Sequence, residues 1–135
     1  MAKGYDNSQA RKQALSLFGK DLARRSKSTC ELSGESGVPL QIYEIHPIPS
    51  EPDYEKCLFL SEATIEQLNQ PAKHLVADKW RHLNELIWTD LPQVQLMTVR
   101  ILQYIATEHS WAQDIIDEAY LDEDLLNLAQ ESPLA

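Results

Sequence analysis

The chain has 135 residues, of which 43% are hydrophobic and 24% are charged, and its formal net charge is −9. This length and composition fit a small globular domain with its own hydrophobic core, and they exclude a wholly disordered chain. No apolar run approaches the roughly 18 residues that a membrane span needs, and two cysteines are too few for a disulfide scaffold. The N-terminus lacks the apolar stretch of a secretory signal, so we expect a cytoplasmic protein without a membrane partner.

Charge is distributed unevenly along the chain. Residues 1–28 contain seven basic and two acidic side chains, whereas the remainder contains 5 basic and 19 acidic ones. The simplest interpretation is an amphipathic helix with a basic, solvated face, because a net negative chain repels nucleic acid at long range. The alternative is a local nucleic-acid contact through the basic residues of this segment, which are Arg11, Lys12, Lys20, Arg24, Arg25 and Lys27.

The first half of the sequence predicts a helix and a pair of strands. Residues 7–25 have N-capping side chains at their start and apolar residues, Leu17 among them, at near-helical spacing. Residues 38–45 alternate with period two, which predicts a strand with Ile42 on one face and Tyr43 on the other. The proline-rich residues 46–52 predict an extended loop, and residues 56–60 predict the second strand.

The second half predicts a series of short helices. One begins at Ser61 and ends by Pro71, and another, residues 78–88, is expected to place Trp80 and Trp88 in the core. Pro92 suits the first position of the next helix. Ser110 is predicted to cap the following helix, which includes Tyr120, and Asp122 is predicted to start a final acidic turn.

Together these elements predict an α+β fold that is mostly α. It comprises an N-terminal helix, a β-hairpin of the zinc-ribbon or treble-clef type and a C-terminal helical cluster. We divide the chain into residues 1–70 and residues 71–135, packed as one domain. We expect hydrophobic packing to stabilise the hairpin, with buried side chains at Leu32, Ile42, Leu58 and Leu60.

One spacing has the layout of a zinc knuckle. Cys30 and Ser33 are separated by two residues, and so are Ser61 and Thr64 after the second strand. Two pairs with this separation, each on a tight turn, are how four-cysteine zinc sites chelate the metal. Three of the four positions here carry hydroxyls, which stay neutral at pH 7 and are poor zinc ligands beside thiolates. We therefore expect no zinc and no other cofactor.

The chain resembles the bacterial PhnA-like family, whose members carry the label alkylphosphonate utilisation. The resemblance lies in the stretch MAKGYDNSQARKQALSLFGKDLARRSKSTCELSGESGVPLQIYEI, in EKCLFLSEAT, and in WRHLNELIW and WAQDIIDEAYLDED. Members of the family have two cysteine pairs that form a zinc ribbon, and these fall on Cys30, Ser33, Ser61 and Thr64. The resemblance therefore implies a zinc ribbon whose ligand positions are vestigial. Many members continue into a small SH3-like β domain, which this sequence does not contain.

Catalytic interpretations find little support in the residues. In the register of an HNH nuclease, the metal-activating histidine would fall on Glu44 and the later one near Ile65, and neither can provide an imidazole. Cys30 follows basic residues that could favour a thiolate, although a small buried cysteine is the simpler interpretation. The sequence contains no phosphate-binding glycine loop and no serine-hydrolase motif.

The sequence therefore predicts a non-catalytic protein-interaction module, with a homodimer or another protein as its partner. Two alternatives remain open. One is a protein associated with phosphonate metabolism, as the family label implies, and it requires a pocket of converging cations. The other is a nucleic-acid-binding factor that uses the basic N-terminal helix.

Overall fold

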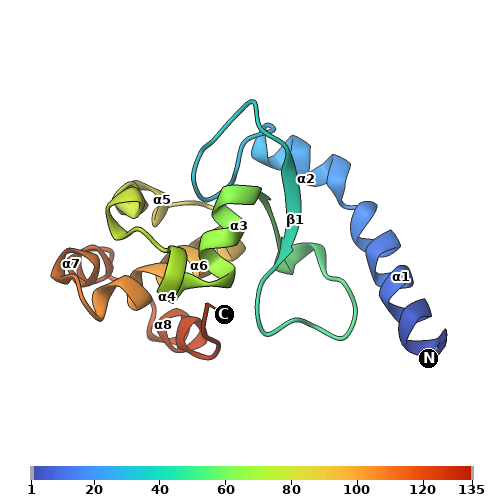
Figure 1. Ribbon diagram of the computed structural model, residues 1–135. Coiled ribbons are helices and arrows are strands. Elements are labelled where there is room, and N and C mark those ends of the chain that lie inside the picture. The colour runs from blue at the N-terminus through green and yellow to red at the C-terminus, as the bar shows by residue number, and fades with distance from the viewer. Residues whose placement is uncertain (1, 135) are drawn as a thin grey trace. The chain divides into compact units, whose positions relative to one another are not determined.

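The computed structural model describes residues 2–134, with side chains from residue 8 onward. Within these residues the chain forms eight α-helices, two short 3-10 helices and one two-stranded antiparallel sheet, so the predicted α+β, mostly α class is confirmed (Figure 1). The elements of the first half are α1 (Ala2–Ser16), α2 (Gly19–Ser26), β1 (Leu40–Glu44), the 3-10 helix η1 (Tyr54–Lys56) and β2 (Cys57–Ser61). Those of the second half are α3 (Glu62–Asn69), α4 (Pro71–His74), η2 (Ala77–Trp80), α5 (Leu83–Leu86), α6 (Pro92–Ala106), α7 (Ser110–Glu118) and α8 (Glu123–Gln130).

The chain divides into two compact units, Met1–Glu62 and Ala63–Ala135, whereas the sequence placed the boundary at residue 70. The first unit contains the two N-terminal helices and the hairpin. The second consists of helices and their connections, with α3 at its start.

The hairpin of the first unit has the predicted strands, each shortened or shifted by a residue or two. β1 and β2 pair antiparallel, with Leu40 opposite Ser61 and Glu44 opposite Cys57. Tyr43 points to the buried face of β1. Ile45, one residue beyond the end of the strand, is buried on the same face.

The predicted core of the hairpin is correct for three of its four residues. Leu32, Leu58 and Leu60 are buried, whereas Ile42 is only half-buried. The prediction for Ile42 was wrong because the alternation of β1 directs the side chains of Tyr43 and Ile45, and not that of Ile42, to the fully buried face.

The predicted helix over residues 7–25 is in fact two helices. Tight turns of the 3-10 type, with Leu17 N–H donating to the Ala14 carbonyl (3.3 Å) and Phe18 N–H to the Leu15 carbonyl (2.9 Å), end α1. Phe18 then packs edge-on against Tyr54, with ring centroids 5.7 Å apart. The turn leaves the side chain of Leu17 78% exposed, although the sequence placed it on the apolar stripe.

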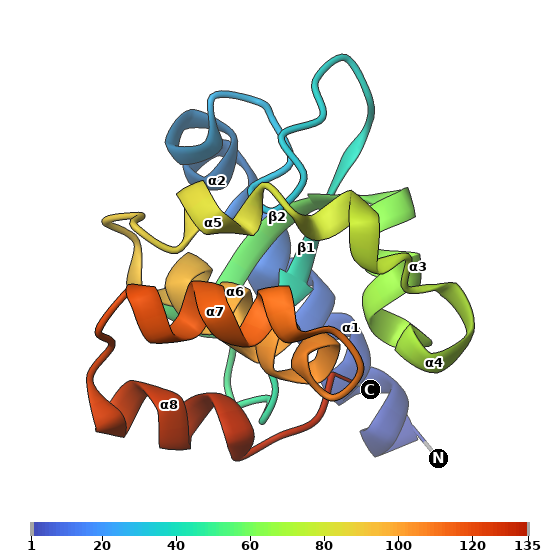
Figure 2. The ribbon, with the colours of Figure 1, turned by 90° about the vertical axis from the view of Figure 1, so that its left-hand side faces the viewer.

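Helix α6 forms the centre of the second unit, and α7 and α8 both pack on it (Figure 2). Pro92 occupies its first turn, as predicted. Its inward-facing side chains are buried along the whole helix and include Val94, Met97, Ile101, Leu102 and Ile105. The Asp122 carboxylate accepts a hydrogen bond from Asp124 N–H (2.8 Å) and caps α8, at the position where the sequence predicted the start of a final acidic turn.

Several features of the second unit differ from the prediction. The helix predicted over residues 78–88 is instead the 3-10 helix η2 followed by the short α5. Ser110, predicted as a cap, is the first residue of α7, whose N-cap is His109 without a side-chain hydrogen bond. The short helix α4 was missed, because Pro71 was taken as the end of a helix when it opens the next one. Trp80 is buried and donates its indole N–H to Gln67 Oε1 (2.9 Å), but Trp88 is 64% exposed. Trp88 lies outside the core because α5 ends at Leu86 and Ile87 takes the inward position. No helix in the described part of the chain is long and apolar enough to cross a membrane.

Candidate functional site

The predicted metal-ligand position Cys30 begins a tight turn in the first unit. Cys30 N–H donates to the Glu35 carbonyl and Gly34 N–H donates to the Cys30 carbonyl, both at 2.8 Å. Gly34 has φ +80°, a conformation that favours glycine. The Cys30 sulfur accepts a hydrogen bond from Ser33 N–H at 3.4 Å. Residues 30–35 therefore form a tight turn, which we call the knuckle turn.

Within the first unit, the Glu35 carboxylate joins this turn to the end of β2. Glu35 Oε1 accepts hydrogen bonds from the hydroxyl of Ser33 (3.1 Å) and from that of Ser61 (2.7 Å), at the end of β2. The fourth predicted position, Thr64, is buried on α3 in the second unit. Since hydroxyls that donate to a carboxylate have neither the charge nor the softness of thiolates, these residues do not fit a zinc ion. Among the side chains that the structure describes, residues 8–134, no three from His, Cys, Asp or Glu gather as a metal site.

A buried ion pair between Arg25 and Glu31 stabilises the same turn. Arg25 of α2 donates two hydrogen bonds to the Glu31 carboxylate (2.7 and 2.9 Å) and a third to the Cys57 carbonyl (2.9 Å). Glu31 also accepts a hydrogen bond from Phe59 N–H (2.8 Å), so one carboxylate connects α2, the knuckle turn and β2. The guanidinium lies 5.1 Å from the ring centre of Tyr54. Burial opposes the charge of Arg25, but the bonds to Glu31 outweigh it and raise the pKa of the guanidinium.

The cysteines do not have the surroundings of reactive thiols. Cys30 and Cys57 are not joined by a disulfide, and both are almost fully buried. Burial, with smaller contributions from Glu44 and Asp53, raises the pKa of the Cys57 thiol to about 11. A buried, protonated thiol is a poor nucleophile, so Cys57 has a packing role.

The six cations suggested for nucleic-acid contact fall into two groups. Arg11 donates to the Glu44 carboxylate and to the Ser50 and Pro49 carbonyls, and Arg25 is bound to Glu31, so both are held inside the first unit. The remaining four are exposed: Lys12, Lys20, Arg24 and Lys27. Glu44, the position considered for a nuclease base, is the partner of Arg11, and Ile65 is half-buried on α3.

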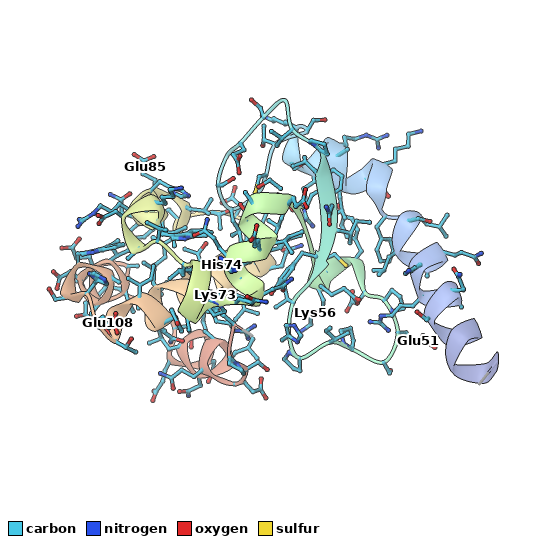
Figure 3. The ribbon with its side chains drawn as sticks, in the orientation of Figure 1. Glu51, Lys56, Lys73, His74, Glu85 and Glu108 are labelled. Carbon is cyan, nitrogen blue, oxygen red and sulfur yellow. The ribbon has the colours of Figure 1, made fainter. Side chains whose placement is uncertain are left out.

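The histidines of the second unit belong to separate parts of it. Figure 3 shows Lys73 and His74 on α4. His74 Nε2 lies 3.7 Å from a Glu66 carboxylate oxygen, His82 stacks on Trp80, and His109 is the N-cap residue of α7. Their separate surroundings do not suggest a shared metal site.

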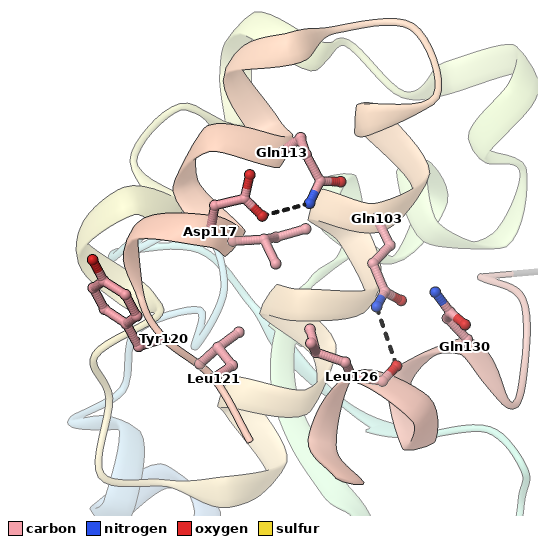
Figure 4. Close-up of a pocket in the computed structure, with 8 residues that line it drawn as sticks. Gln103, Gln113, Asp117, Tyr120, Leu121, Leu126 and Gln130 are labelled. Atoms are coloured by element: carbon pink, nitrogen blue, oxygen red, sulfur yellow. Dashed lines mark hydrogen bonds between the residues drawn. The ribbon is translucent and has the colours of Figure 1, made fainter. Parts of the chain in front are cut away.

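A pocket of about 290 Å³ lies among α6, α7 and α8 (Figure 4). Its polar wall contains Gln103, which donates to the Leu126 carbonyl (3.2 Å), and Gln113, which donates to Asp117 Oδ1 (2.9 Å). Apolar side chains form the rest of the lining: Ile116, Leu121 and Leu126. A volume at the lower end of the range for ligand pockets suits one side chain better than a larger ligand.

The helix beside this pocket is anchored by a buried arginine. Arg100 of α6 is 4% exposed and donates to the carbonyls of Ala129 (2.8 Å) and Leu128 (3.4 Å). Both carbonyls belong to the last turn of α8, where acceptors run short of helical N–H donors, although Leu128 also accepts from Glu131 N–H (3.2 Å). The arginine thus fixes α8 against α6 and keeps the pocket formed.

Tyr120, which lines the pocket, has an unusual backbone conformation. It is the residue after the C-cap of α7 and has φ +49°, where helices most often place glycine. A side chain in this conformation costs about 1–2 kcal/mol, yet Tyr120 is 91% exposed and so recovers little of that cost by burial. The sequence placed Tyr120 within the helix. The helix in fact ends at Glu118, and the acidic residues around Tyr120 were the available signal of a surface position.

No protein-family model, no curated protein and no solved structure matches this chain.

Proposed function

We propose that the chain is a non-catalytic, PhnA-like protein-interaction module without zinc, and that Tyr120 and the pocket among α6, α7 and α8 are its docking site. The observation that carries the proposal is the 91% exposure of Tyr120 at φ +49°. A strained and exposed aromatic side chain adds nothing to the fold, so its use lies in a contact with another molecule. Tyrosine suits that use because it offers a large apolar surface with a polar tip, and it is enriched where interfaces are strongest.

The hydrogen bonds of the knuckle turn support a protein without zinc. The hydroxyls of Ser33 and Ser61 are donors to Glu35, and that carboxylate holds the two parts of the turn together. A protein organised in this way has no folding requirement for a metal. The non-catalytic part is supported by the surroundings of Cys57, whose thiol stays protonated.

The proposal competes with the phosphonate interpretation of the family label. That interpretation requires cations that converge on an anion, and Arg11 and Arg25 are instead bound to Glu44 and Glu31. We expect methylphosphonate to leave the melting temperature unchanged in a thermal-shift experiment.

The proposal is tested by photo-crosslinking from position 120. Tyr120 is replaced by a photoreactive phenylalanine analogue and irradiated in a cell extract, with the same analogue at Tyr104 as the matched control. We expect adducts from position 120 that excess unlabelled wild-type protein suppresses and that excess Tyr120→Gly protein does not. The docking site would be refuted if no adducts formed, or if wild-type and Tyr120→Gly protein suppressed the adducts equally.

The same variant separates binding from folding. Glycine removes the strain at φ +49°, so Tyr120→Gly should raise the free energy of unfolding by about 1 kcal/mol while it abolishes competition. Loss of stability together with loss of binding would instead indicate that Tyr120 has a structural role.

A further inference from the structure

Each of the two units displays one large apolar or aromatic side chain that is almost fully exposed. In the first unit it is Leu17, 78% exposed in the turn between α1 and α2, and in the second it is Tyr120, 91% exposed after α7. Single exposed apolar residues are common. These two differ in their surroundings, which are basic for Leu17 and acidic for Tyr120.

The surroundings of Leu17 are basic. Lys20 and Arg24 are four residues apart and therefore lie on one side of α2, and Leu17 lies in the turn that leads into this helix. We call Leu17, Lys20 and Arg24 the basic face. All three are exposed, and Arg24 has only a long ion pair with Asp21, at 3.8 Å between two exposed groups. The neighbouring Arg25 does not belong to this face, because Glu31 holds it inside the unit.

The surroundings of Tyr120 are acidic. Asp117 and Glu118 precede it at the end of α7, and Asp122 and Glu123 follow it at the start of α8. All four carboxylates are exposed, and none has an ion pair within the described part of the chain. We call Tyr120 with these four residues the acidic face. The second unit as a whole carries twelve acidic and four basic residues.

We propose that the acidic face of one copy of this chain binds the basic face of a second copy. Leu17 lies against the ring of Tyr120 and the apolar wall of the pocket, and Lys20 and Arg24 reach the surrounding carboxylates. Complementary charge supports this occupant, because opposite charges around an apolar centre steer association and fix its register. The inference names the partner at the site of the proposed function and therefore rests on it.

The partner is a second copy because the complement of each face is carried by the same chain. If both contacts form between the same two molecules, they are related by a two-fold axis and close a dimer. If they form with different neighbours, the copies join into longer chains, and either arrangement is self-association. Since the charged groups are at the surface, salt should weaken the contact strongly.

The test is sedimentation velocity of the purified full chain over a range of concentrations. At about 50 mM salt we expect the weight-average sedimentation coefficient to rise with concentration, and at about 0.5 M salt, where screening is much stronger, we expect a monomer. A chain that stays monomeric at low salt up to about 0.5 mM, a concentration well above a micromolar dissociation constant, would overturn the inference.

Charge reversal tests whether these two faces make the contact. Lys20→Glu/Arg24→Glu makes both faces acidic. Asp117→Lys/Glu118→Lys/Glu123→Lys reverses three of the four carboxylates, leaves the helix cap Asp122 in place and makes both faces basic. Each variant alone should therefore lose self-association. A 1:1 mixture restores an opposite charge at both contacts and should associate at least as well as the wild type. Failure of the mixture to associate would overturn the inference.

The matched control is Lys73→Glu/Lys79→Glu, which changes the net charge as much as the first variant does but lies on α4 and η2 (Figure 3). It should self-associate within about twofold of the wild type. If it becomes monomeric as well, net charge and not the basic face explains the result, and the inference fails.

The outcomes also separate this inference from the proposed function. A monomeric chain that still forms competed adducts from position 120 refutes the second copy as partner and leaves the docking site standing. Self-association that survives Tyr120→Gly refutes both the acidic face and the docking site.

Discussion

Replacing Glu31 by glutamine should destabilise the first unit more than any other single removal of charge on it. The Glu31 side chain is 4% exposed and accepts three hydrogen bonds, two from Arg25 and one from Phe59 N–H. Glutamine keeps the size and one acceptor oxygen but leaves the guanidinium, itself only 12% exposed, without its counter-charge. Breaking a buried pair from one side costs about 3–5 kcal/mol, because an uncompensated charge remains inside the protein.

The measurement is urea unfolding followed by far-ultraviolet circular dichroism. With an m-value of about 1–2 kcal/mol per molar urea, a loss of this size lowers the midpoint by about 1.5–5 M. The matched control is Asp21→Asn, which breaks the exposed pair with Arg24 and should change stability by less than about 1 kcal/mol.

A second variant keeps the reasoning testable if Glu31→Gln does not fold. In Arg25→Leu/Glu31→Leu both charges are replaced by apolar side chains of moderate size, which is often neutral for a buried pair. We expect this double variant to be more stable than Glu31→Gln. If Glu31→Gln shifts the midpoint no further than Asp21→Asn does, the buried pair does not hold the turn and the argument is refuted.

Three further predictions follow from the first unit. Purified protein should contain far less than one zinc per chain by mass spectrometry of the metal, and treatment with a chelator should leave its melting temperature unchanged; stoichiometric zinc would contradict our assignment of the knuckle. Because burial raises the pKa of Cys57 to about 11, the folded thiol stays protonated after the unfolded one ionises, so its stabilising contribution is complete below about pH 8.5 and declines as the pH rises to 11. The advantage in unfolding free energy of the wild type over Cys57→Ala should therefore shrink by about 2–3 kcal/mol across that range, and a constant difference would argue against a buried thiol. Gly19→Ala should stabilise α2 by about 0.5–1 kcal/mol, since a Cβ there meets nothing within 4 Å, whereas Gly34→Ala should destabilise because Gly34 has φ +80°; equal effects in thermal unfolding would refute the distinction.

The sequence predicted those parts of the fold that depend on local chemistry. Alternation located the first strand and a short apolar run the second, and Pro92 marked the start of its helix, because periodicity and φ restriction act within a few residues. The fold class followed from these elements.

The errors concern side chains whose direction depends on where a helix ends. Leu17, Trp88 and Tyr120 all extend a helical apolar pattern, and all three are exposed because the helix stops one or two residues before them. A periodic pattern cannot distinguish the last helical residue from the first residue of the turn, since one position changes the direction of a side chain by about 100°. The basic and acidic faces proposed for association are centred on two of these three residues.

The knuckle could be located from the sequence, but what holds it together could not. The spacing drew attention to Cys30 and Ser33, and nothing in it singled out Glu35, two residues further on. Its role depends on the turn at Gly34, which brings the carboxylate between Ser33 and Ser61. Long-range hydrogen bonds of this kind are set by the register of the hairpin, and no local pattern encodes them.

The stability of a turn held by a carboxylate depends on other conditions than that of a turn held by a zinc ion. A zinc-held knuckle gains its folding free energy from binding, so its folded fraction depends on free zinc and on the protonation of the ligands. Hydrogen bonds from Ser33 and Ser61 to a carboxylate contribute less, about 1.5–3 kcal/mol each at most, but they are independent of any ligand concentration. The Arg25–Glu31 pair and the buried side chains of β2 add to the stability of the same turn. These hydrogen bonds connect the turn to β2 and, through Arg25, to α2, the helix that carries Lys20 and Arg24 of the basic face.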